Sequence, residues 1–268
     1  MTKTIDTILV ATDFSACAEN ALQYAIHWAL TIEARIVLVR VYTLPASTYD
    51  RPAQEAYEEK LAQLRSDYFH PNKNDFDFEL RFHESAEEEI IKVAEEKSAA
   101  LIIMGTRGAH GITALLGTTT THLIRETTIP VLAVPEEAVF TGVQKIAFAC
   151  DYKKLDDIAP VHFLRMLAEV FQARILIFNV NAEAKEMPIV EAIQVFRLDH
   201  YLEASPHSFE FADGADVEEA LETFVKTHQV DVLTMIPQKH NLLERLFKGS
   251  LTNKMLYKTH IPILTFHP

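Results

Sequence analysis

Hydrophobic residues along this chain fall into short runs rich in β-branched side chains, and longer stretches with a helical period separate these runs. In the first half the runs cover residues 6–12, 35–41, 76–82, 101–104 and 130–134. The helical patterns between them lie near residues 15–32, 53–69, 86–97 and 118–127. Uninterrupted apolar runs are typical of strands that are buried on both faces. The pattern therefore predicts an α/β fold, a parallel five-stranded sheet with helices on both sides.

The second half repeats this pattern. The segment IDTILVATDFSACAENALQYAIHWALTIEARIVLVRV near the start is matched by VQKIAFACDYKKLDDIAPVHFLRMLAEVFQARILIFNV halfway along. In each segment an apolar run ends in an aspartate, Asp13 or Asp151, before a helical stretch and a second apolar run. The halves also end alike, with IPV at residues 129–131 and IPI at residues 261–263. Landmarks that recur at a nearly constant distance indicate a tandem duplication.

The duplication sets the expected domain organisation. Strands of the second copy are expected at residues 144–149, 174–180, 207–212, 231–236 and 261–266. The acidic, turn-like EEAVFTG at residues 136–142 is expected to be the linker. The chain should thus form two tandem five-stranded sandwiches, one in residues 1–138 and one in residues 142–268.

Composition excludes several classes of function. The chain has 268 residues, of which 49% are hydrophobic and 24% are charged, an ordinary globular balance. No apolar stretch approaches the roughly 18 residues that cross a bilayer, and an aspartate interrupts the N-terminal segment before a signal peptide could develop. We therefore expect a soluble cytoplasmic protein with no membrane partner. The formal net charge of −13 opposes binding to a phosphate backbone, so nucleic acid is not an expected partner.

Cysteine and histidine predict neither a disulfide scaffold nor a metal site. The two cysteines, Cys17 and Cys150, are too few for either, and Cys150 lies in an apolar run, as a buried small hydrophobe would. The twelve histidines form neither HExxH nor a Cys/His cluster, so no metal ligand is expected. His110 and His122 flank the glycine-rich segment described next, and both are expected at the surface.

Glycine is concentrated in one segment. None of the seven glycines precedes residue 105, and four of them fall within MGTRGAHGITALLGTTTTHLI, which leaves a strand and enters a helix. A glycine-rich turn before a helix N-terminus presents free N–H groups to an anion, and the alternative is a connector whose glycines only make turns. The segment matches neither GxxxxGK[ST] nor GxGxxG, so phosphate binding is expected but fast phosphoryl transfer is not.

The helix expected at residues 86–97 carries a start signal of its own. Ser85 stands three residues before Glu88, in the spacing of a capping box. The acidic run at residues 87–89 complements the positive end of the helix and is expected to form a solvated face.

In these features the chain resembles the universal stress protein family in its tandem two-domain form. ATP-binding members of that family carry Gly, two residues, Gly, nine residues, then Gly-Ser or Gly-Thr. Here Gly105, Gly108 and Gly117-Thr118 match in order, except that eight residues separate the second glycine from the third. The segment VATDFS matches the first-strand signature. The resemblance implies a Rossmann-like fold of the adenine-nucleotide alpha-hydrolase type in each half.

The resemblance also implies roles for individual residues. Asp13 would lie near base and ribose, and Val41 would meet the adenine. Arg107 is either a phosphate contact or a solvated loop residue. The complete set that the resemblance assigns to a bound nucleotide is Ala11, Thr12, Asp13, Val41, Met104, Gly105, Arg107, Gly108, Gly117, Thr118 and Thr119.

The second half departs from the motif. Ile236 and Lys239 stand where the first two glycines would be, while Gly249-Ser250 remains. Side chains at these positions would crowd a nucleotide, so the second half is expected to be a degenerate, structural copy.

The closing strands lead to an expectation about assembly. In the strand order of the family, residues 129–134 and 261–266 lie at the sheet edges. Exposed apolar edges are normally covered or paired. Pairing these two edges would make an intramolecular pseudo-dimer, and a further homodimer is compatible with this arrangement but not required by it.

The leading hypothesis is a non-enzymatic regulator of the stress response. It would bind ATP or another adenine nucleotide, with or without Mg, in its first domain and would show at most weak ATP hydrolysis. The alternative is an interaction module that binds no nucleotide and acts through an unknown protein partner. An enzyme of the wider nucleotide-binding α/β group is disfavoured because the sequence has neither GxSxG nor SxxK.

Overall fold

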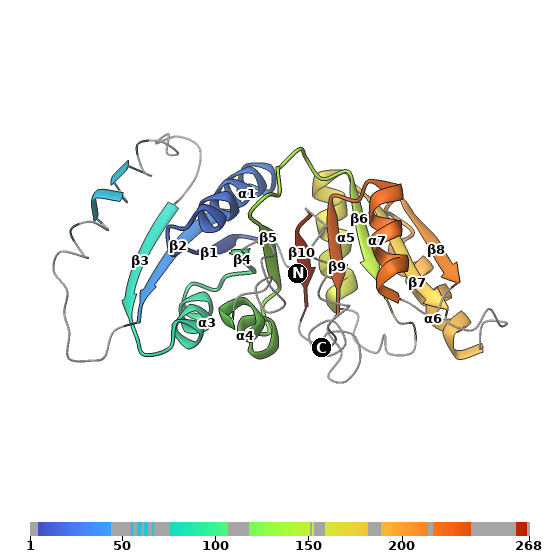
Figure 1. Cartoon of the computed structure of the whole chain (residues 1–268). Helices are drawn as coiled ribbons and strands as arrows, with labels where there is room; N and C mark the ends of the chain where they lie inside the picture. The colour runs from blue at the N-terminus through green and yellow to red at the C-terminus, as the bar shows by residue number, and fades with distance from the viewer. Residues whose placement is uncertain are drawn as a thin grey trace.

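Ten strands form one continuous sheet in the part of the chain that the structure describes (Figure 1). This computed structural model describes residues 5–43, 76–106, 118–150, 159–181, 189–213, 217–236 and 261–266, with isolated positions between them. The order across the sheet is β3-β2-β1-β4-β5-β10-β9-β6-β7-β8. The first five strands in this order belong to the first half of the chain and the last five to the second.

The elements of the first half follow the predicted alternation. They are β1 (Thr7–Ala11), α1 (Ala16–Ile32), β2 (Arg35–Tyr42), β3 (Phe76–Phe82), α3 (Ala86–Glu96), β4 (Leu101–Thr106), α4 (Thr118–Glu126) and β5 (Val131–Pro135). The helix expected near residues 53–69 lies mostly outside the described residues. One of the two hydrogen bonds of the expected capping box is confirmed: the Ser85 hydroxyl accepts from the Glu88 backbone N–H at 3.2 Å.

The second half repeats the alternation, as predicted. Its elements are β6 (Lys145–Ala149), α5 (Ala159–Phe171), β7 (Arg174–Asn181), α6 (Ile189–Leu202), β8 (His207–Asp213), α7 (Val217–His228), β9 (Val232–Met235) and β10 (Ile263–Thr265). The apolar runs became strands because each contributes side chains to a core on both faces of the sheet. Cys150 is buried, as expected.

The two halves join through their closing strands, which confirms the predicted pseudo-dimer. Strand β5 pairs with β10 in antiparallel register, with Leu132 opposite Leu264, and both leucines are fully buried. The other strand pairs are parallel. An antiparallel junction between two parallel sheets is what an approximate two-fold axis produces. The domain limits at residues 138 and 142 remain a prediction.

One face of the sheet has a core that runs through both halves. Helices α1, α5 and α6 pack on it, and Trp28 of α1 meets Phe171 of α5 at 5.0 Å between ring centroids. On the opposite face, α3 and α4 cover one core while α7 covers another. The residues after β5 are also tied to α1, since the Asn20 amide donates to the carbonyls of Pro135 and Ala138, each at 2.9 Å. Among the described residues, no helix has the length and apolar character needed to cross a membrane.

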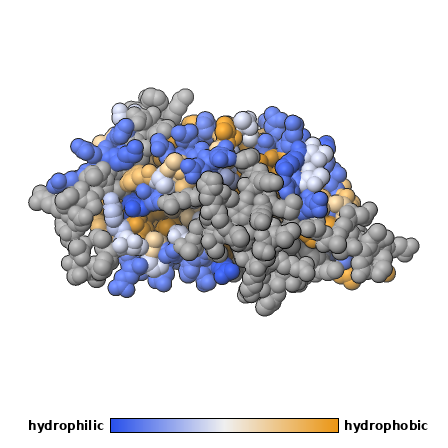
Figure 2. Space-filling view, in the orientation of Figure 1, coloured by the Kyte–Doolittle hydropathy of each residue, from blue (hydrophilic) through white to orange (hydrophobic). Residues whose placement is uncertain are grey.

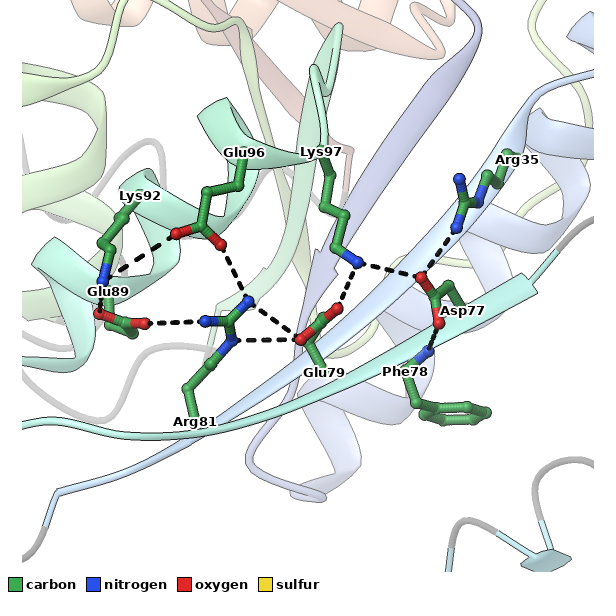
Figure 3. Close-up of polar contacts among 9 residues, drawn as sticks. All are labelled: Arg35, Asp77, Phe78, Glu79, Arg81, Glu89, Lys92, Glu96 and Lys97. Atoms are coloured by element: carbon green, nitrogen blue, oxygen red, sulfur yellow. Dashed lines mark hydrogen bonds and ion pairs between the residues drawn. The ribbon is translucent and has the colours of Figure 1, made fainter.

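Helix α3 is fastened to β3 by a network of charges (Figure 3). Arg81 of β3 reaches Glu96 at 2.9 Å and Glu89 at 3.7 Å. Lys97 pairs with Glu79, and with Asp77 at 3.1 Å. The expectation that residues 87–89 form a solvated face was therefore wrong for Glu89, which is only 4% exposed because Arg81 supplies a partner from the neighbouring strand.

Candidate functional site

A pocket of about 490 Å³ lies at the carboxyl ends of β1, β2 and β4. Strand β1 stands between β2 and β4. The chain continues from β1 to β2 and β3 on one side and then crosses to β4 on the other side, so the strand order reverses at β1. Open parallel sheets bind their ligands at such a switch point. The volume is within the range of roughly 300–1,000 Å³ usual for small-molecule sites. Its lining consists of Ala11, Thr12, Asp13, Cys17, Ala18, Val39, Arg40, Val41, Thr43, Ala86, Ile90, Met104, Gly105, Thr106, Thr119 and Thr120.

Most residues assigned by the sequence resemblance meet in this pocket. Those that line it are Ala11, Thr12, Asp13, Val41, Met104, Gly105 and Thr119. Arg107, Gly108 and Gly117 lie outside the described residues. Thr118 begins α4, and nothing is described of its side chain. The structure thus brings the first-strand signature and the start of α4 together.

A tight turn carries Asp13 to the mouth of the pocket. The Thr12 backbone N–H donates to the Val39 carbonyl at 2.9 Å, which anchors the turn to β2. The Asp13 carboxylate accepts from the Ser15 backbone N–H at 2.9 Å and from the Ser15 hydroxyl. Phe14 takes the left-handed conformation, with φ 61°. These bonds hold an exposed carboxylate at the start of α1.

Comparison with known proteins identifies the family to which this fold and pocket belong. The model of the universal stress protein family matches residues 4–135, the half of the chain that holds the pocket. By this match, the chain belongs to the universal stress protein family. No match was found among curated proteins.

Solved structures extend the likeness of fold to both halves. A universal stress protein from Archaeoglobus fulgidus is 16% identical, with 99% of each chain covered and a TM-score of 0.76. A functionally unknown protein from Pseudomonas aeruginosa PAO1 is 14% identical over 98% of this chain and 93% of the other, with a TM-score of 0.66. A putative universal stress protein from Pseudomonas aeruginosa UCBPP-PA14 is 15% identical over 98% and 94%, with a TM-score of 0.63. The tandem universal stress protein fold therefore spans the whole chain.

Within this universal stress protein fold, Gly105 has a packing role that the sequence did not reveal. A Cβ atom placed on it would lie 2.2 Å from the Cys17 carbonyl oxygen and 2.7 Å from the Ala18 nitrogen. The absence of a side chain thus lets α1 approach the end of β4. The sequence marked this position as part of a nucleotide site, which stays a prediction; the reason for glycine that the structure shows is the close approach of α1.

Arg40 is a candidate binding residue that sequence analysis missed. Its guanidinium lies 4.8 Å from the centre of the Tyr42 ring and donates to the Thr12 carbonyl at 3.4 Å. Its Nε atom is buried with no hydrogen-bond partner among the described residues. Of the described residues that line the pocket, Arg40 is the single cationic one. A lone arginine at a strand end carries no sequence signal that separates it from a solvated one.

In the second half an uncharged residue makes the hydrogen bond that Arg40 makes in the first half, from the second strand to the carbonyl just after the first strand. Asn179 of β7 donates through Nδ2 to the Cys150 carbonyl at 2.7 Å, as Arg40 donates to Thr12 in the first half. In the strand pairing, Met235 lies opposite Ala149 as Met104 lies opposite Ala11, so Ile236 takes the place of Gly105. Lys239 and Gly249-Ser250 are outside the described residues.

A second carboxylate stands behind the pocket wall. The Thr119 hydroxyl donates to Glu87 Oε1 at 2.8 Å, and the Ser85 hydroxyl donates to Glu87 Oε2 at 3.2 Å. Burial by itself raises the pKa of Glu87. Hydrogen bonds from its own backbone N–H, Thr119 and Ser85, with the nearby His122, outweigh burial and hold that pKa below its usual range. His122 is exposed on α4, as expected.

Proposed function

We propose that this universal stress protein is a regulator that binds an adenine nucleotide, ATP foremost, in the pocket of its first half. The observation that carries the proposal is the meeting of the first-strand signature, the end of β2 and the start of α4 around one pocket at the switch point of the sheet. The apolar lining from Val39, Val41 and Ile90 suits a base, because ligand pockets are mostly apolar with a few placed polar groups.

Charge within the pocket supports an anionic ligand. The chain as a whole is acidic, with a formal net charge of −13. The guanidinium of Arg40 nevertheless lies in the pocket lining, with its Nε buried and unpaired among the described residues. A cation retained in such a place favours a ligand that brings negative charge or hydrogen-bond acceptors.

Binding rather than catalysis is the proposed activity, with weak hydrolysis at most. A general base must lie within hydrogen-bond reach of the water it activates and have free acceptor capacity. Of the described residues that line the pocket, Asp13 is the single carboxylate, and its Oδ1 already accepts two hydrogen bonds from Ser15. It is therefore better placed to hold the turn than to activate water.

The test of this proposal is Arg40→Asn. The substitution installs the residue that the second half uses at the same corner, so the fold should tolerate it. Calorimetric titration with ATP in the presence of Mg²⁺ should show one site per wild-type chain. Affinity in the variant should be about tenfold lower, because a hydrogen bond to a charged group contributes roughly 1.5 kcal/mol or more.

The matched control is Arg125→Asn, the same charge change on α4 at a residue that does not line the pocket. It should bind ATP as the wild type does. Absence of binding heat in the wild type, or two equivalent sites per chain, contradicts the proposal.

The second candidate is an interaction module, and α6 favours it. Ile189, Val190, Ile193 and Phe196 of this helix are between 54% and 79% exposed. In Figure 2 hydrophobic surface appears at the lower right, over the position of α6. An exposed apolar patch is typical of a contact surface for another protein.

A further inference from the structure

The outer face of α6 is made of large apolar side chains that project into solvent. Its members are Ile189, Val190, Ile193 and Phe196, each between 54% and 79% exposed. A single exposed apolar side chain, such as Leu30 on α1, is ordinary in a protein surface and needs no explanation. Four of them on one face of one helix mark a surface that another molecule covers.

The inner face of α6 is apolar as well and already packs against the sheet. Leu198 and Leu202 are buried there, and Val195 and Tyr201 are partly buried against the same core. A helix with apolar side chains on opposite sides is normally covered on both. The chain buries the inner face of α6 and leaves the outer face open, so the missing cover must come from elsewhere.

The first half does not share this apolar outer face. The helical pattern near residues 53–69 takes the corresponding place there, between the second and third strands of its half. Exposed positions described in it include Glu55, Glu58 and Glu59, which are charged as a solvated face requires. The apolar outer face is therefore specific to the second half. Figure 1 shows α6 beside the outer strands of that half, at the end of the molecule away from the first half.

The spacing along the outer face is that of a seam between two paired helices. Ile189, Ile193, Phe196 and His200 follow one another at intervals of four, three and four residues, as the seam positions of a coiled coil do. If two such seams run antiparallel about a two-fold axis between residues 194 and 195, Ile193 of one copy meets Phe196 of the other. At each end Ile189 meets His200. Apolar contacts then lie at the centre and polar groups at the rim, as in other protein interfaces.

The charges of α6 favour a second copy of this chain in that orientation. The chain has a formal net charge of −13, so two copies can approach only where carboxylates are few. Glu191 lies on the inner side of the helix, because it stands four residues before the partly buried Val195. Exposed Arg197 and Asp199 flank the seam on opposite sides. A parallel pairing would bring each of them beside its own copy, whereas the antiparallel pairing brings Arg197 beside Val190 of the second copy.

We propose that the outer face of α6 binds the same face of a second copy of this chain, with the two helices antiparallel about a two-fold axis. The four apolar side chains offer about 300 Å² in each copy. With the polar rim the total buried area is about 1,000 Å², at the low end for specific interfaces, so the dimer is reversible, with a Kd in the micromolar range. The inference goes beyond nucleotide binding in the first half and does not depend on it.

Sedimentation velocity of the full chain at concentrations from about 1 to about 200 μM, on both sides of the expected Kd, tests the proposal. The wild-type mass should rise with concentration from 30.4 kDa toward twice that value. Ile193→Glu places two carboxylates in the seam and should weaken association at least about a hundredfold, which keeps the chain monomeric. The matched control is Leu30→Glu, a similar change at the exposed apolar side chain of α1, and it should dimerise as the wild type does.

A pair of variants at Val190 tests the orientation of the two helices. Val190→Glu brings a carboxylate beside Arg197 of the second copy, whereas Val190→Lys brings a like charge. The lysine variant should therefore associate at least about tenfold more weakly than the glutamate variant, and added salt should narrow the difference. Circular dichroism shows whether each variant keeps the fold, which is expected because the changed side chains are exposed.

Three results would overturn the inference. They are a wild type that stays monomeric at every concentration, an Ile193→Glu variant that dimerises with the wild-type affinity, and equal affinities of the two Val190 variants. The first of them leaves the outer face of α6 to a partner other than this chain. Because ATP binding is measured at the other end of the molecule, none of the three bears on the nucleotide proposal.

Discussion

Single residues decide how closely the elements around the pocket approach one another. Gly105 is the clearest case, because the backbone of α1 occupies the space that a side chain would need. Arg40 and Asn179 show the converse, two different side chains that close the same corner in the two halves. The approach of α1 to β4 therefore depends on the missing side chain of Gly105, whereas the hydrogen bond between the first two strands of each half can be made by either arginine or asparagine.

Gly105→Ala is expected to lower the free energy of unfolding by about 3 kcal/mol, because the new Cβ would overlap the Cys17 carbonyl and force α1 away from β4. Urea denaturation measures this change. The control is Gly142→Ala: this glycine has φ +105° and open space for 4 Å around the place that a Cβ would take, so backbone strain alone should cost about 1 kcal/mol. Equal losses in the two variants would show that the contact with α1 is unimportant.

Sequence reasoning reached some of these residues and missed others for physical reasons. Glycine clustering and the VATDFS segment mark positions where the backbone itself matters, and such positions carry a local signal. The burial of Glu89 depends on Arg81 of the neighbouring strand β3. The position of Arg40 depends on the ring of Tyr42, two residues along β2. No local pattern distinguishes a charged side chain that finds a partner from one that stays in water.

At the scale of elements, the charge network of Figure 3 fixes α3 against the outer strand β3. Burial raises the pKa of Asp77, but the hydrogen bonds from Lys97 and the Phe78 backbone and the charges of Lys97 and Arg35 outweigh it and lower that pKa. A carboxyl with a lowered folded-state pKa stabilises the protein above its unfolded pKa of about 3.9. That stabilisation is lost as the pH falls through the lower folded value.

Asp77→Asn should therefore lower the stability at pH 7 by at most about 1 kcal/mol, because the carboxylate is 35% exposed and screened by solvent. The wild type and the variant should converge in stability as the pH falls below about 4. Thermal unfolding at pH 7, 5 and 3 measures the difference. Exposed Glu95 on α3 supplies the control, Glu95→Gln, and a constant gap between wild type and Asp77→Asn at all three pH values would refute the assignment.

The order of elements was the most predictable level of this structure. The inner strands are buried on both faces and require continuous apolar runs, whereas the outer strands β3 and β8 mix apolar and polar residues; the duplication displays this order twice. The pairing of β5 with β10 also followed from the need to cover two apolar edges. The ion pairs between α3 and β3 did not follow, because they depend on the reach of side chains rather than on the period of the sequence.

At the scale of the whole molecule, the shared core predicts that both halves unfold together. Trp28 is the single tryptophan of the chain, is fully buried and contacts Phe171 of the other half. Across the same boundary, burial and the charge of Asp231 raise the pKa of Tyr24 to about 12. Contacts of this kind couple the stability of each half to the presence of the other.

Unfolding by urea, followed by tryptophan fluorescence and by far-ultraviolet circular dichroism, should give one coincident transition. Trp28→Phe keeps an aromatic ring. It should lose no hydrogen bond, because the indole N–H has no partner among the described residues. Trp28→Ala should cost about 4 kcal/mol through the cavity it leaves. Circular dichroism alone measures the two variants, because neither keeps a tryptophan. Two separate transitions in the wild type would show that the halves are independent.

The antiparallel junction of β5 and β10 has a consequence for how the molecule behaves on dilution. Two separate chains joined by such an edge would come apart and exchange partners as their concentration fell. Here a covalent tether holds the two edges at an effective concentration that does not depend on the amount of protein. The unlike halves therefore keep a fixed one-to-one ratio, and neither can be replaced by a second copy of the other.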